Sequence, residues 1–467
     1  MSCDPVTIYG EASTRVSAYR KFLEERCGEV PRVETLDDFR RLPMMKKADY
    51  AAYYPLQELL LDGTILGKHS LVKSSGTTGK GFFWPITQEE HLGVVPGMKA
   101  AFSRILAEDR LPTLAAIAFP LGSWSTGVTS CVSFTNLAAA HRGLTVVTPG
   151  CDTEEILLVL DQLSPMFRQT LLFTFPPHAK AVLEEARRRG MPLESYNLML
   201  VVGGEGISES FREHLIRYIR PNLDDLTAVW SVYGSADFGD VGYESHACIA
   251  LRRILHENGL ARQILGTDEI PMIFQSPQGG AYFEIVDEEM VVSRLQGAPI
   301  VRYRTGDRVA FVPYLEMAQR VRDAGYDLRG YLKTPSLHPE HEAPFLLLYG
   351  RVDGAVFFYG AYITVDQVRC ALESPALEGL YTGRFLMRTV ARPDGDATLE
   401  ITLEDTPAVR EADPAELSRR IADAMSRTQE QYREFCLTLG ENALPRIVLA
   451  PAEVFKAGWK SRHKAVV

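Results

Sequence analysis

The sequence predicts an α/β fold built in at least two domains. Between residues 114 and 232, short apolar runs alternate with longer amphipathic segments. This alternation is typical of a parallel sheet covered by helices on both faces. The chain has 467 residues, too many for one ordinary core, and its 46% hydrophobic and 24% charged content is that of a globular protein. We therefore expect a large α/β domain and at least one further domain.

The elements of the large domain follow from this pattern in chain order. An amphipathic helix is expected over residues 8–27, where apolar side chains recur at helical spacing. Buried strands are expected at 114–118, 145–147, 171–175, 198–202 and 228–232, with helices at 152–163, 176–189 and 208–220. Asp152 is the expected N-cap of the first of these helices, with Glu155 three residues on. The strands should form mostly parallel sheets.

After residue 280 the pattern changes. Two runs at 282–287 and 289–293 resemble a hairpin, so a β-rich subdomain is expected there. The segment Gly350-Arg351-Val352-Asp353-Gly354 marks the boundary between domains of residues 1–349 and 350–467. In the second domain, strands are expected at 355–358, 384–390, 398–403 and 446–449, with helices at 365–372 and after an Asp413 N-cap. This is the pattern of a small α+β domain.

Charge and cysteine usage exclude several classes of protein. Lys and Arg number 50 against 60 Asp and Glu, a net charge of −10, which argues against a sequence-independent nucleic-acid binder. No secretory signal is visible, and the longest apolar runs fall far below the roughly 18 residues of a membrane-spanning helix. The seven cysteines are scattered without C-x-x-C spacing, as in a reducing compartment. We expect a cytoplasmic protein with neither a nucleic-acid nor a membrane partner.

The sharpest local feature is a segment rich in serine, threonine and glycine. It reads Ser74-Ser75-Gly76-Thr77-Thr78-Gly79-Lys80. Its hydroxyls, unobstructed backbone N–H groups and single cation are what phosphate oxygens require. It is not a Walker A loop, because two residues rather than four separate Gly76 from Gly79, and Gly81 follows the lysine. Composition alone leaves an ordinary surface loop as the alternative.

Three further segments fall where a small ligand would bind. Gly203-Gly204-Glu205 and Tyr233-Gly234-Ser235 each follow a predicted parallel strand, and ligands of open α/β sheets bind at such carboxyl ends. In the third, Asp307 follows a Thr-Gly turn, where its carboxylate could accept both hydroxyls of a ribose. A salt-bridged turn is the alternative there. Tyr233 could stack on a purine or could simply pack in the core.

These segments occur in the order of a known set of motifs. Residues 74–80, 233–234, 302–307 and 350–353 resemble the core motifs of the adenylate-forming enzymes: acyl-CoA synthetases, peptide-synthetase adenylation domains and luciferases. The form of the 74–80 loop, Leu42-Pro43 with the following Lys46/Lys47 pair, residues 203–205 and the ending Lys464-Ala465 resemble the phenylacetate–CoA ligase branch. The likeness spans nearly the whole chain.

The resemblance implies an architecture and a reaction. A large N-terminal domain, residues 1–349, would bind ATP and the acyl group, and a small C-terminal domain, residues 350–467, would move about a hinge at Asp353. A carboxylate would attack the α-phosphorus of MgATP to give acyl-AMP and pyrophosphate. A thiol, usually that of CoA, would then take the acyl group.

Individual roles carry over by position. The 74–80 loop would hold the β- and γ-phosphates, residues 203–205 and Tyr233 would line the adenine site, and Asp307 would bind the ribose. The implied ATP- and AMP-binding residues are Ser74, Ser75, Gly76, Thr77, Thr78, Gly79, Lys80, Gly203, Gly204, Glu205, Tyr233, Gly234, Ser235, Ala236, Asp307 and Arg351.

The basic end of the chain supplies the implied catalytic residue. Residues 456–467 contain Lys456, Lys460, Arg462 and Lys464 but no acid. A lysine ammonium between the carboxylate and the phosphate would stabilise the charge that passes to the bridging oxygen. Lys464 matches the family's lysine because Ala465 follows it. Lys460 remains a rival, and a solvated basic tail is the structural alternative.

The sequence departs from the family pattern after Tyr233-Gly234. Ala236 lacks the hydroxyl that would meet the α-phosphate, and Ser235 could supply it one place earlier. Asp237 is one methylene shorter than the glutamate expected to approach Mg²⁺. Some relatives hold a structural zinc, but His246, Cys248 and His256 would not complete four-coordinate closure, so we expect no zinc.

By family position, the resemblance implies that residues 122–127 line an acyl pocket, with Phe119 and Trp124 as aromatic walls suited to an aryl acid. A hydrolase is not expected, because Trp124 stands where the G-x-S-x-G pattern needs its serine.

Three functions remain for test. The first is an AMP-forming ligase that passes an aryl or other small carboxylic acid to CoA. The second passes the acyl group to a separate carrier protein or an amine. The third, motivated by Ala236 and Asp237, is a degenerate nucleotide-binding protein. The expected cofactors and co-substrates are ATP, Mg²⁺ and CoA, and either a monomer or a homodimer is compatible with the sequence.

Overall fold

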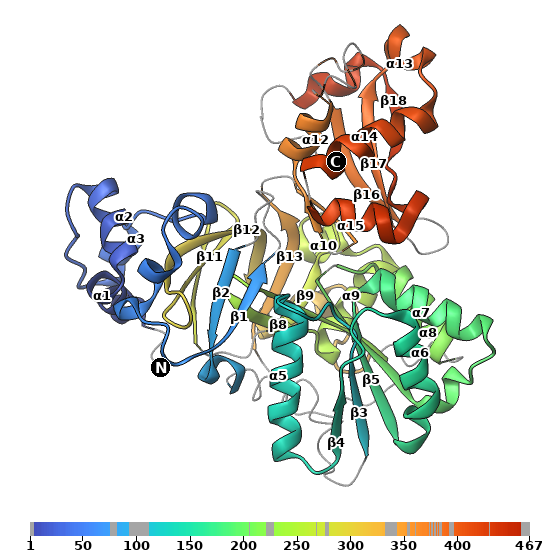
Figure 1. The fold of residues 1–467 in the computed structure, drawn as a ribbon, viewed down its shortest axis with the longest axis horizontal. Coiled ribbons are helices and arrows are strands. Elements are labelled where there is room, and N and C mark those ends of the chain that lie inside the picture. The colour runs from blue at the N-terminus through green and yellow to red at the C-terminus, as the bar shows by residue number, and fades with distance from the viewer. Residues whose placement is uncertain are drawn as a thin grey trace. The chain divides into compact units, whose positions relative to one another are not determined.

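The computed structural model describes most of the chain. The described residues are 4–74, 82–92, 112–204, 206–220, 228–267, 269–275, 280–331, 343–352, 355–359, 361–372, 374, 377, 380, 382, 385–391, 397–428 and 430–458. They fall into two compact units, one ending at Gly350 and the other beginning at Arg351 (Figure 1). The expected ATP- and acyl-binding role of the first and the expected mobility of the second stay predictions.

The first unit holds one large mixed sheet. Its described strands follow the order β10-β11-β12-β13-β9-β8-β7-β6-β5-β3-β4. They are β3 (Thr113–Ile117), β4 (Leu144–Val147), β5 (Gln169–Thr174), β6 (Leu198–Gly203), β7 (Val229–Ser235), β8 (Gly239–Tyr243), β9 (Met272–Gln275), β10 (Tyr282–Val286), β11 (Glu289–Arg294), β12 (Ile300–Val312) and β13 (Phe345–Arg351). The α/β fold class predicted from the sequence is confirmed.

Parallel and antiparallel pairing divide this sheet. Strand β3 pairs in parallel with β4 and β5, and β5, β6 and β7 continue in parallel. From β7 through β8 and β9 to β13 the pairing is antiparallel, as it is among β10, β11 and β12. The sheet is therefore mixed rather than mostly parallel, and the expected β-rich subdomain continues the parallel strands in the same sheet. Sequence periodicity did not reveal this because strand order depends on long-range pairing.

Helices cover the parallel strands on both faces. The described helices of this unit are α1 (Pro5–Arg15), α2 (Ser17–Cys27), α3 (Leu36–Arg40), α5 (Ser125–Ala140), α6 (Thr153–Gln162), α7 (Pro176–Arg188), α8 (Glu209–Ile219), α9 (His246–Asn258), α10 (Ala261–Leu265) and α11 (Tyr314–Asp323). The chain steps outward from β3 to β4 and then back across β3 to β5. Right-handed crossovers consequently put α5 on one face and α6, α7 and α8 on the other (Figure 1).

The N-terminal helix differs from the expectation. In place of one helix over 8–27, α1 and α2 meet at Val16, whose extended backbone (φ −112°, ψ 107°) breaks the hydrogen-bond ladder. Val16 is buried, and a β-branched residue adopts the extended conformation readily. The break turns the apolar faces of both helices onto one core. A separate hairpin, β1 (Lys68–Ser74) with β2 (Phe82–Thr87), lies in the same unit.

The second unit has its own hydrophobic core, which includes Phe358, Ile401, Ile421 and Tyr432. Its described elements are β14 (Val356–Phe358), β15 (Ala361–Ile363), α12 (Val365–Leu372), β16 (Phe385–Ala391), β17 (Ala397–Glu404), α13 (Pro407–Glu411), α14 (Pro414–Thr428), α15 (Glu430–Leu439) and β18 (Arg446–Ala450). This is the α+β arrangement that the sequence predicts.

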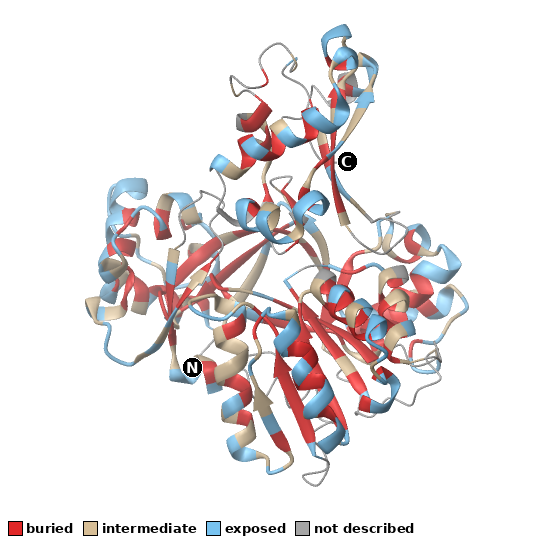
Figure 2. Cartoon of the chain, turned by 45° about the vertical axis from the view of Figure 1, so that its right-hand side comes forward, coloured by how far each residue is buried: buried red, intermediate tan, exposed pale blue. Residues whose placement is uncertain are grey.

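Burial follows the sheet. Figure 2 shows the central parallel strands β3, β5 and β6 almost entirely buried, with exposed residues on the outer faces of the surrounding helices, whereas the edge strand β4 is buried only at Leu144. In the described part of the chain, every helix is too short or too polar to cross a lipid bilayer.

Candidate functional site

At the carboxyl ends of the parallel strands, Gly203-Gly204 lies against two phenylalanine rings. Phe119 follows β3, Phe175 follows β5, and Gly203-Gly204 ends β6. The rings of Phe119 and Phe175 meet edge to face, with centroids 5.2 Å apart. Gly204 has φ +81°, and a Cβ there would lie 2.8 Å from Cε1 of Phe175. Both the backbone conformation and the lack of space therefore require glycine at this turn.

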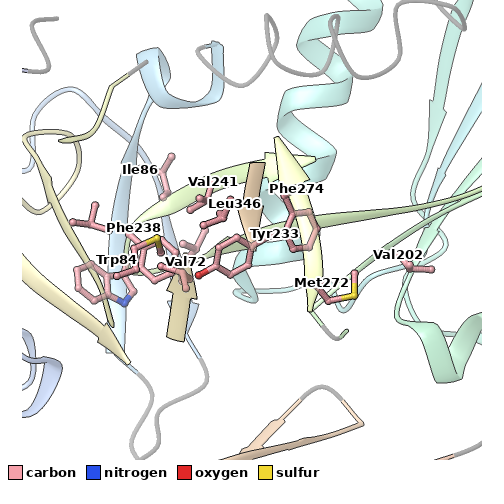
Figure 3. Packing of buried hydrophobic residues seen from close by; sticks show 14 of the residues in the cluster. Val72, Trp84, Ile86, Val202, Tyr233, Phe238, Val241, Met272, Phe274 and Leu346 are labelled. Carbon is pink, nitrogen blue, oxygen red and sulfur yellow. The ribbon is translucent and has the colours of Figure 1, made fainter. Parts of the chain in front are cut away.

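Tyr233 joins two of the predicted motifs. It lies near the end of β7, and its ring stacks on Phe274 of β9 with centroids 5.5 Å apart (Figure 3). Its hydroxyl donates to Oδ2 of Asp307 at 2.5 Å. Residues 74 positions apart in the chain thus share a buried hydrogen bond. This contact orients the carboxylate predicted to bind a ribose.

The segment containing Asp307 is an irregularity inside a strand, not the turn expected from Thr-Gly. Strand β12 runs through it, and the pairing with β11 shifts register there. Thr305 Oγ1 donates to the carbonyl of Met290 at 2.9 Å and accepts from the N–H of Asp307 at 3.1 Å. The N–H of Gly306 donates to Glu289 at 2.8 Å. These bonds fix the backbone on both sides of Asp307.

The sequence did not assign Lys47 to the site, but its ammonium contacts Ser74, the last residue of β1. Lys47 Nζ donates to Oγ of Ser74 at 2.7 Å and is 3.4 Å from Oδ1 of Asp237. Ser74 also accepts a bond from the indole of Trp84 at 3.1 Å, and Asp237 accepts one from Tyr303 at 2.6 Å. We call these five residues the Lys47 group. The group places the Lys47 ammonium beside Ser74, the first residue of the predicted phosphate-binding segment 74–80.

The position of Lys47 is set by a backbone bridge. The N–H of Met45 donates to the carbonyl of Arg302, and the N–H of Arg304 donates to the carbonyl of Met45, at 3.1 and 2.9 Å. A short π-helical turn over Lys47–Ala51 follows, with Asp49 accepting from the N–H of Lys46 at 2.6 Å. Lys46 is consequently exposed while Lys47 is half-buried. The Leu-Pro-x-x-Lys-Lys pattern was a signal, but it did not say which lysine turns inward.

Both carboxylate oxygens of Asp237 have partners in this structure. Mg²⁺ takes oxygen ligands in near-octahedral geometry, whereas this carboxylate has an ammonium beside one oxygen and a phenol hydroxyl on the other. Ser235 Oγ accepts from the N–H of Asp237 at 3.3 Å, so that hydroxyl also has a local partner. Among the described residues, no three or more His, Cys, Asp or Glu form a metal-binding group. The role of Asp237 as a magnesium ligand stays a prediction.

A second charged pair, Arg294 with Glu90, contacts the turn between β7 and β8. Arg294 of β11 donates to the carbonyl of Asp237 at 3.2 Å and to Glu90 at 2.6 Å. Desolvation by surrounding protein atoms raises the pKa of the Asp240 carboxyl to about 6, and the Arg294 cation acts in the opposite direction. A Cβ on Gly234 would come within 2.9 Å of Asp240 Oδ1, so the two strands approach closely here.

The two predicted acyl-pocket residues differ in their surroundings. Phe119 is buried in the core beside Phe173 and Phe175. Trp124 is half-buried at the start of α5, with the ammonium of Lys73 5.0 Å from its ring centroid. Of the two, Trp124 is the better placed to meet a ligand, and the role of both stays a prediction.

Several predicted site residues lie outside the described residues: Ser75, Gly76, Thr77, Thr78, Gly79, Lys80, Glu205, Asp353, Lys460 and Lys464. Arg351 ends β13 at the start of the second unit. Within the first unit, the structure joins Ser74 to Asp237 through Lys47, and Tyr233 directly to Asp307.

Comparisons with known proteins agree with this fold. No family model matches the chain. The chain is 26% identical over 312 residues to a phenylacetate–coenzyme A ligase of Thermus thermophilus, a match covering 64% of this chain and 62% of that protein. The match thus spans less than two thirds of the relative's length.

Two solved structures of a 2-hydroxyisobutyryl-CoA ligase share the fold. One is a complex with 2-HIB-AMP and CoA in the thioesterification state, at 14% identity and a TM-score of 0.57. The other is the postadenylation state with R3-HIB-AMP, at 14% identity and a TM-score of 0.51. Each alignment covers 99% of this chain and 87% of the other.

In fold, in the order of its motifs and in its sequence match, this chain is similar to the adenylate-forming enzymes. Among them, the sequence similarity is to the phenylacetate–CoA ligase branch. The resemblance predicted from the motifs is confirmed at this level.

Proposed function

We propose that this protein is an AMP-forming acid–thiol ligase, which activates an aryl or other small carboxylic acid with ATP and passes the acyl group to CoA. One observation carries the proposal. Three motifs that are far apart in sequence meet in one unit through the Tyr233–Asp307, Tyr303–Asp237 and Lys47–Ser74 bonds. The similarity to a phenylacetate–coenzyme A ligase supports CoA as the acceptor.

In this proposal the described residues hold the nucleotide. The ammonium of Lys47 and the hydroxyl of Ser74 meet the anionic phosphates, because a half-buried cation attracts an oxyanion more strongly than an exposed one does. Asp307, oriented by Tyr233, accepts the ribose hydroxyls. Gly203 and Gly204 leave room for the adenine at the end of β6. Magnesium would arrive on the ATP phosphates, and Asp237 is the side chain predicted to approach it.

The chemistry balances without a redox partner. A carboxylate oxygen of the acid attacks the α-phosphorus, the bond from that phosphorus to the bridging oxygen breaks, and pyrophosphate leaves. A thiol then attacks the acyl carbon of acyl-AMP, AMP leaves and the thiol proton passes to solvent. Lys464 is the proposed cation of the first step, with Lys460 as its rival.

One set of experiments tests whether the site activates an acid and which group accepts the acyl group. Pyrophosphate exchange into ATP, measured against aromatic, hydroxy-aromatic and aliphatic carboxylates, should depend on the acid. Formation of an acyl-CoA should follow when CoA is added. Acyl-AMP that accumulates despite CoA would favour a carrier-protein or amine acceptor. Exchange that is absent across the whole panel would favour the degenerate nucleotide-binding protein.

The catalytic lysine has its own test. Lys464→Ala should abolish pyrophosphate exchange and leave thioester formation from supplied acyl-AMP largely intact, since only the first step places the carboxylate beside the phosphate. If Lys460→Ala has this effect and Lys464→Ala does not, the assignment is wrong.

A further inference from the structure

A buried ionic cluster lies behind the proposed nucleotide site. We call Glu209 and Arg212 of α8, Glu244 after β8, and Arg252 of α9 the buried quartet. Arg212 contacts Glu209 at 3.1 Å and Glu244 at 2.6 Å. Arg252 contacts Glu209 at 3.0 Å and Glu244 at 3.3 Å. The four side chains are at most 3% exposed. Two cations and two anions therefore cancel within the core.

Stability alone does not account for such a cluster. Removing each ion from water costs several kcal/mol, and well-packed apolar residues of similar size often serve at least as well. Burial opposes ionisation of Glu209, but attraction to Arg212, Arg252 and Arg253 outweighs it and lowers the pKa of Glu209. Glu209 is consequently charged at neutral pH. What the quartet supplies beyond charge balance is a set of directed bonds to the backbone.

Those bonds end on two segments that carry the proposed site. Arg252 donates to the carbonyl of Ile207, in the loop that follows Gly203-Gly204. Glu244 accepts from the N–H of Ser231 at 2.8 Å, and Arg212 donates to the carbonyl of Val229. Ser231 lies two residues before Tyr233 on β7. The quartet thus ties the loop after β6 to the strand that presents Tyr233.

We propose that the buried quartet is a positioning network that holds the loop after β6 against β7, and so sets the affinity of the site for the adenine nucleotide. The inference rests on the proposed function. Arg252, Glu244 and their partners do not contact the nucleotide in this scheme. They act through their bonds to the Ile207 carbonyl and the Ser231 amide. A salt bridge that served only stability would not need these backbone bonds.

The test uses a charge-balanced double variant and a neighbouring control. Arg252→Met removes the donor to Ile207, and Glu209→Gln in the same chain removes the carboxylate left in excess, so that Arg212 and Glu244 remain paired. The control is Arg253→Met. Arg253 is next in α9 and nearly as buried, but it pairs with Glu213 and Glu257. Melting temperature is measured for each variant, and all binding assays are run on folded protein.

Two readouts decide the outcome. In the double variant, amide hydrogen exchange of residues 203–208 should rise, and the dissociation constant for AMP should rise about tenfold, as expected for loss of one charge-assisted hydrogen bond. The KM of the acid should stay within about twofold. Arg253→Met should change neither readout. Unchanged exchange in residues 203–208, or equal effects in the control, would overturn the proposal.

Failure of the proposed function looks different. If the wild-type chain binds no AMP and exchanges no pyrophosphate with any acid, the proposed function fails, and the nucleotide role of the quartet fails with it. If the wild type binds AMP and the double variant binds it equally well, only the positioning proposal is overturned.

Discussion

Two charged clusters in the same unit are built on opposite plans. The buried quartet is closed, because each carboxylate lies between two guanidinium groups at no more than 3% exposure. The Lys47 group is open: its lysine and aspartate side chains are 20% and 12% exposed, and the ammonium is 3.4 Å from the carboxylate. Both clusters join segments that are distant in the chain. Only the second leaves a cation within reach of a ligand.

The difference separates positioning from binding. A closed cluster has satisfied its charges, so a phosphate gains nothing by approaching it. In an open cluster, a lysine with a loosely held partner can exchange that contact for an oxyanion at small cost. We therefore expect changes in the quartet to act mainly on stability and loop order, and changes in the Lys47 group to act mainly on activity.

The largest effect on stability should come from breaking the closed cluster. Arg212→Met leaves Glu209 and Glu244 sharing one guanidinium and should lower the free energy of unfolding by about 3–5 kcal/mol. Lys47→Met should cost about 1 kcal/mol, since one partly exposed hydrogen bond is lost. Urea unfolding at pH 7 measures both. Equal losses would show that the two clusters do not differ as described.

The largest effect on activity should come from the open cluster. Lys47→Met should lower kcat/KM for ATP about 30- to 100-fold, because a charge-assisted phosphate contact is removed. Steady-state kinetics at saturating acid measure this. Lys46→Met is the matched control, since Lys46 is the exposed neighbour, and it should stay within about twofold of wild type. A larger loss in the Lys46 variant would mean that the wrong lysine has been placed in the site.

The glycine turn offers an intermediate effect. Gly204→Ala should weaken AMP binding about tenfold, because the residue has φ +81° and the new Cβ would press on Phe175 at 2.8 Å. Gly190→Ala is the control: it has φ +71°, but nothing lies within 4 Å of its Cβ position. Both should lose about 1–2 kcal/mol of stability from the left-handed backbone. Calorimetry with AMP should show a loss of affinity in the first variant alone.

The smallest effect should be a pH dependence set by Asp240. Its folded pKa is raised to about 6, so the carboxyl is largely neutral at pH 5 and charged at pH 7.5. The added negative charge beside Gly234 should raise the KM for ATP about two- to threefold over that interval. Asp240→Asn should remove this difference. An unchanged pH profile in the variant would place the titrating group elsewhere.

Much of the fold was available from local patterns. The five parallel strands were predicted within a few residues of β3, β4, β5, β6 and β7, because a continuous apolar run between turn residues is a local signal. The helix after Asp152 was equally clear, and Asp152 caps α6 by accepting from the N–H groups of Glu154 and Glu155. The order of the motifs along the chain likewise pointed to the superfamily.

What the sequence left open depends on contacts between distant residues. Glu209 and Arg212 have the spacing of an ordinary surface pair on a helix, and only the packing of α8 against α9 and β7 makes them part of a buried quartet. No local pattern predicts the helix break at Val16, because its extended backbone depends on how the residue is buried in the core. The mixed character of the sheet follows from strand order, which no local window contains.

The sequence by itself therefore determined the fold class, the strands and helices of the parallel half, and the set of residue types that a nucleotide site needs. The tertiary structure alone decided which of them meet. It selected Lys47 over Lys46, engaged Asp237 with Lys47 and Tyr303, and joined Tyr233 to Asp307. The physical reason is range: propensity and periodicity act over a few residues, whereas Lys47 and Asp237 lie 190 positions apart and meet only when the sheet forms.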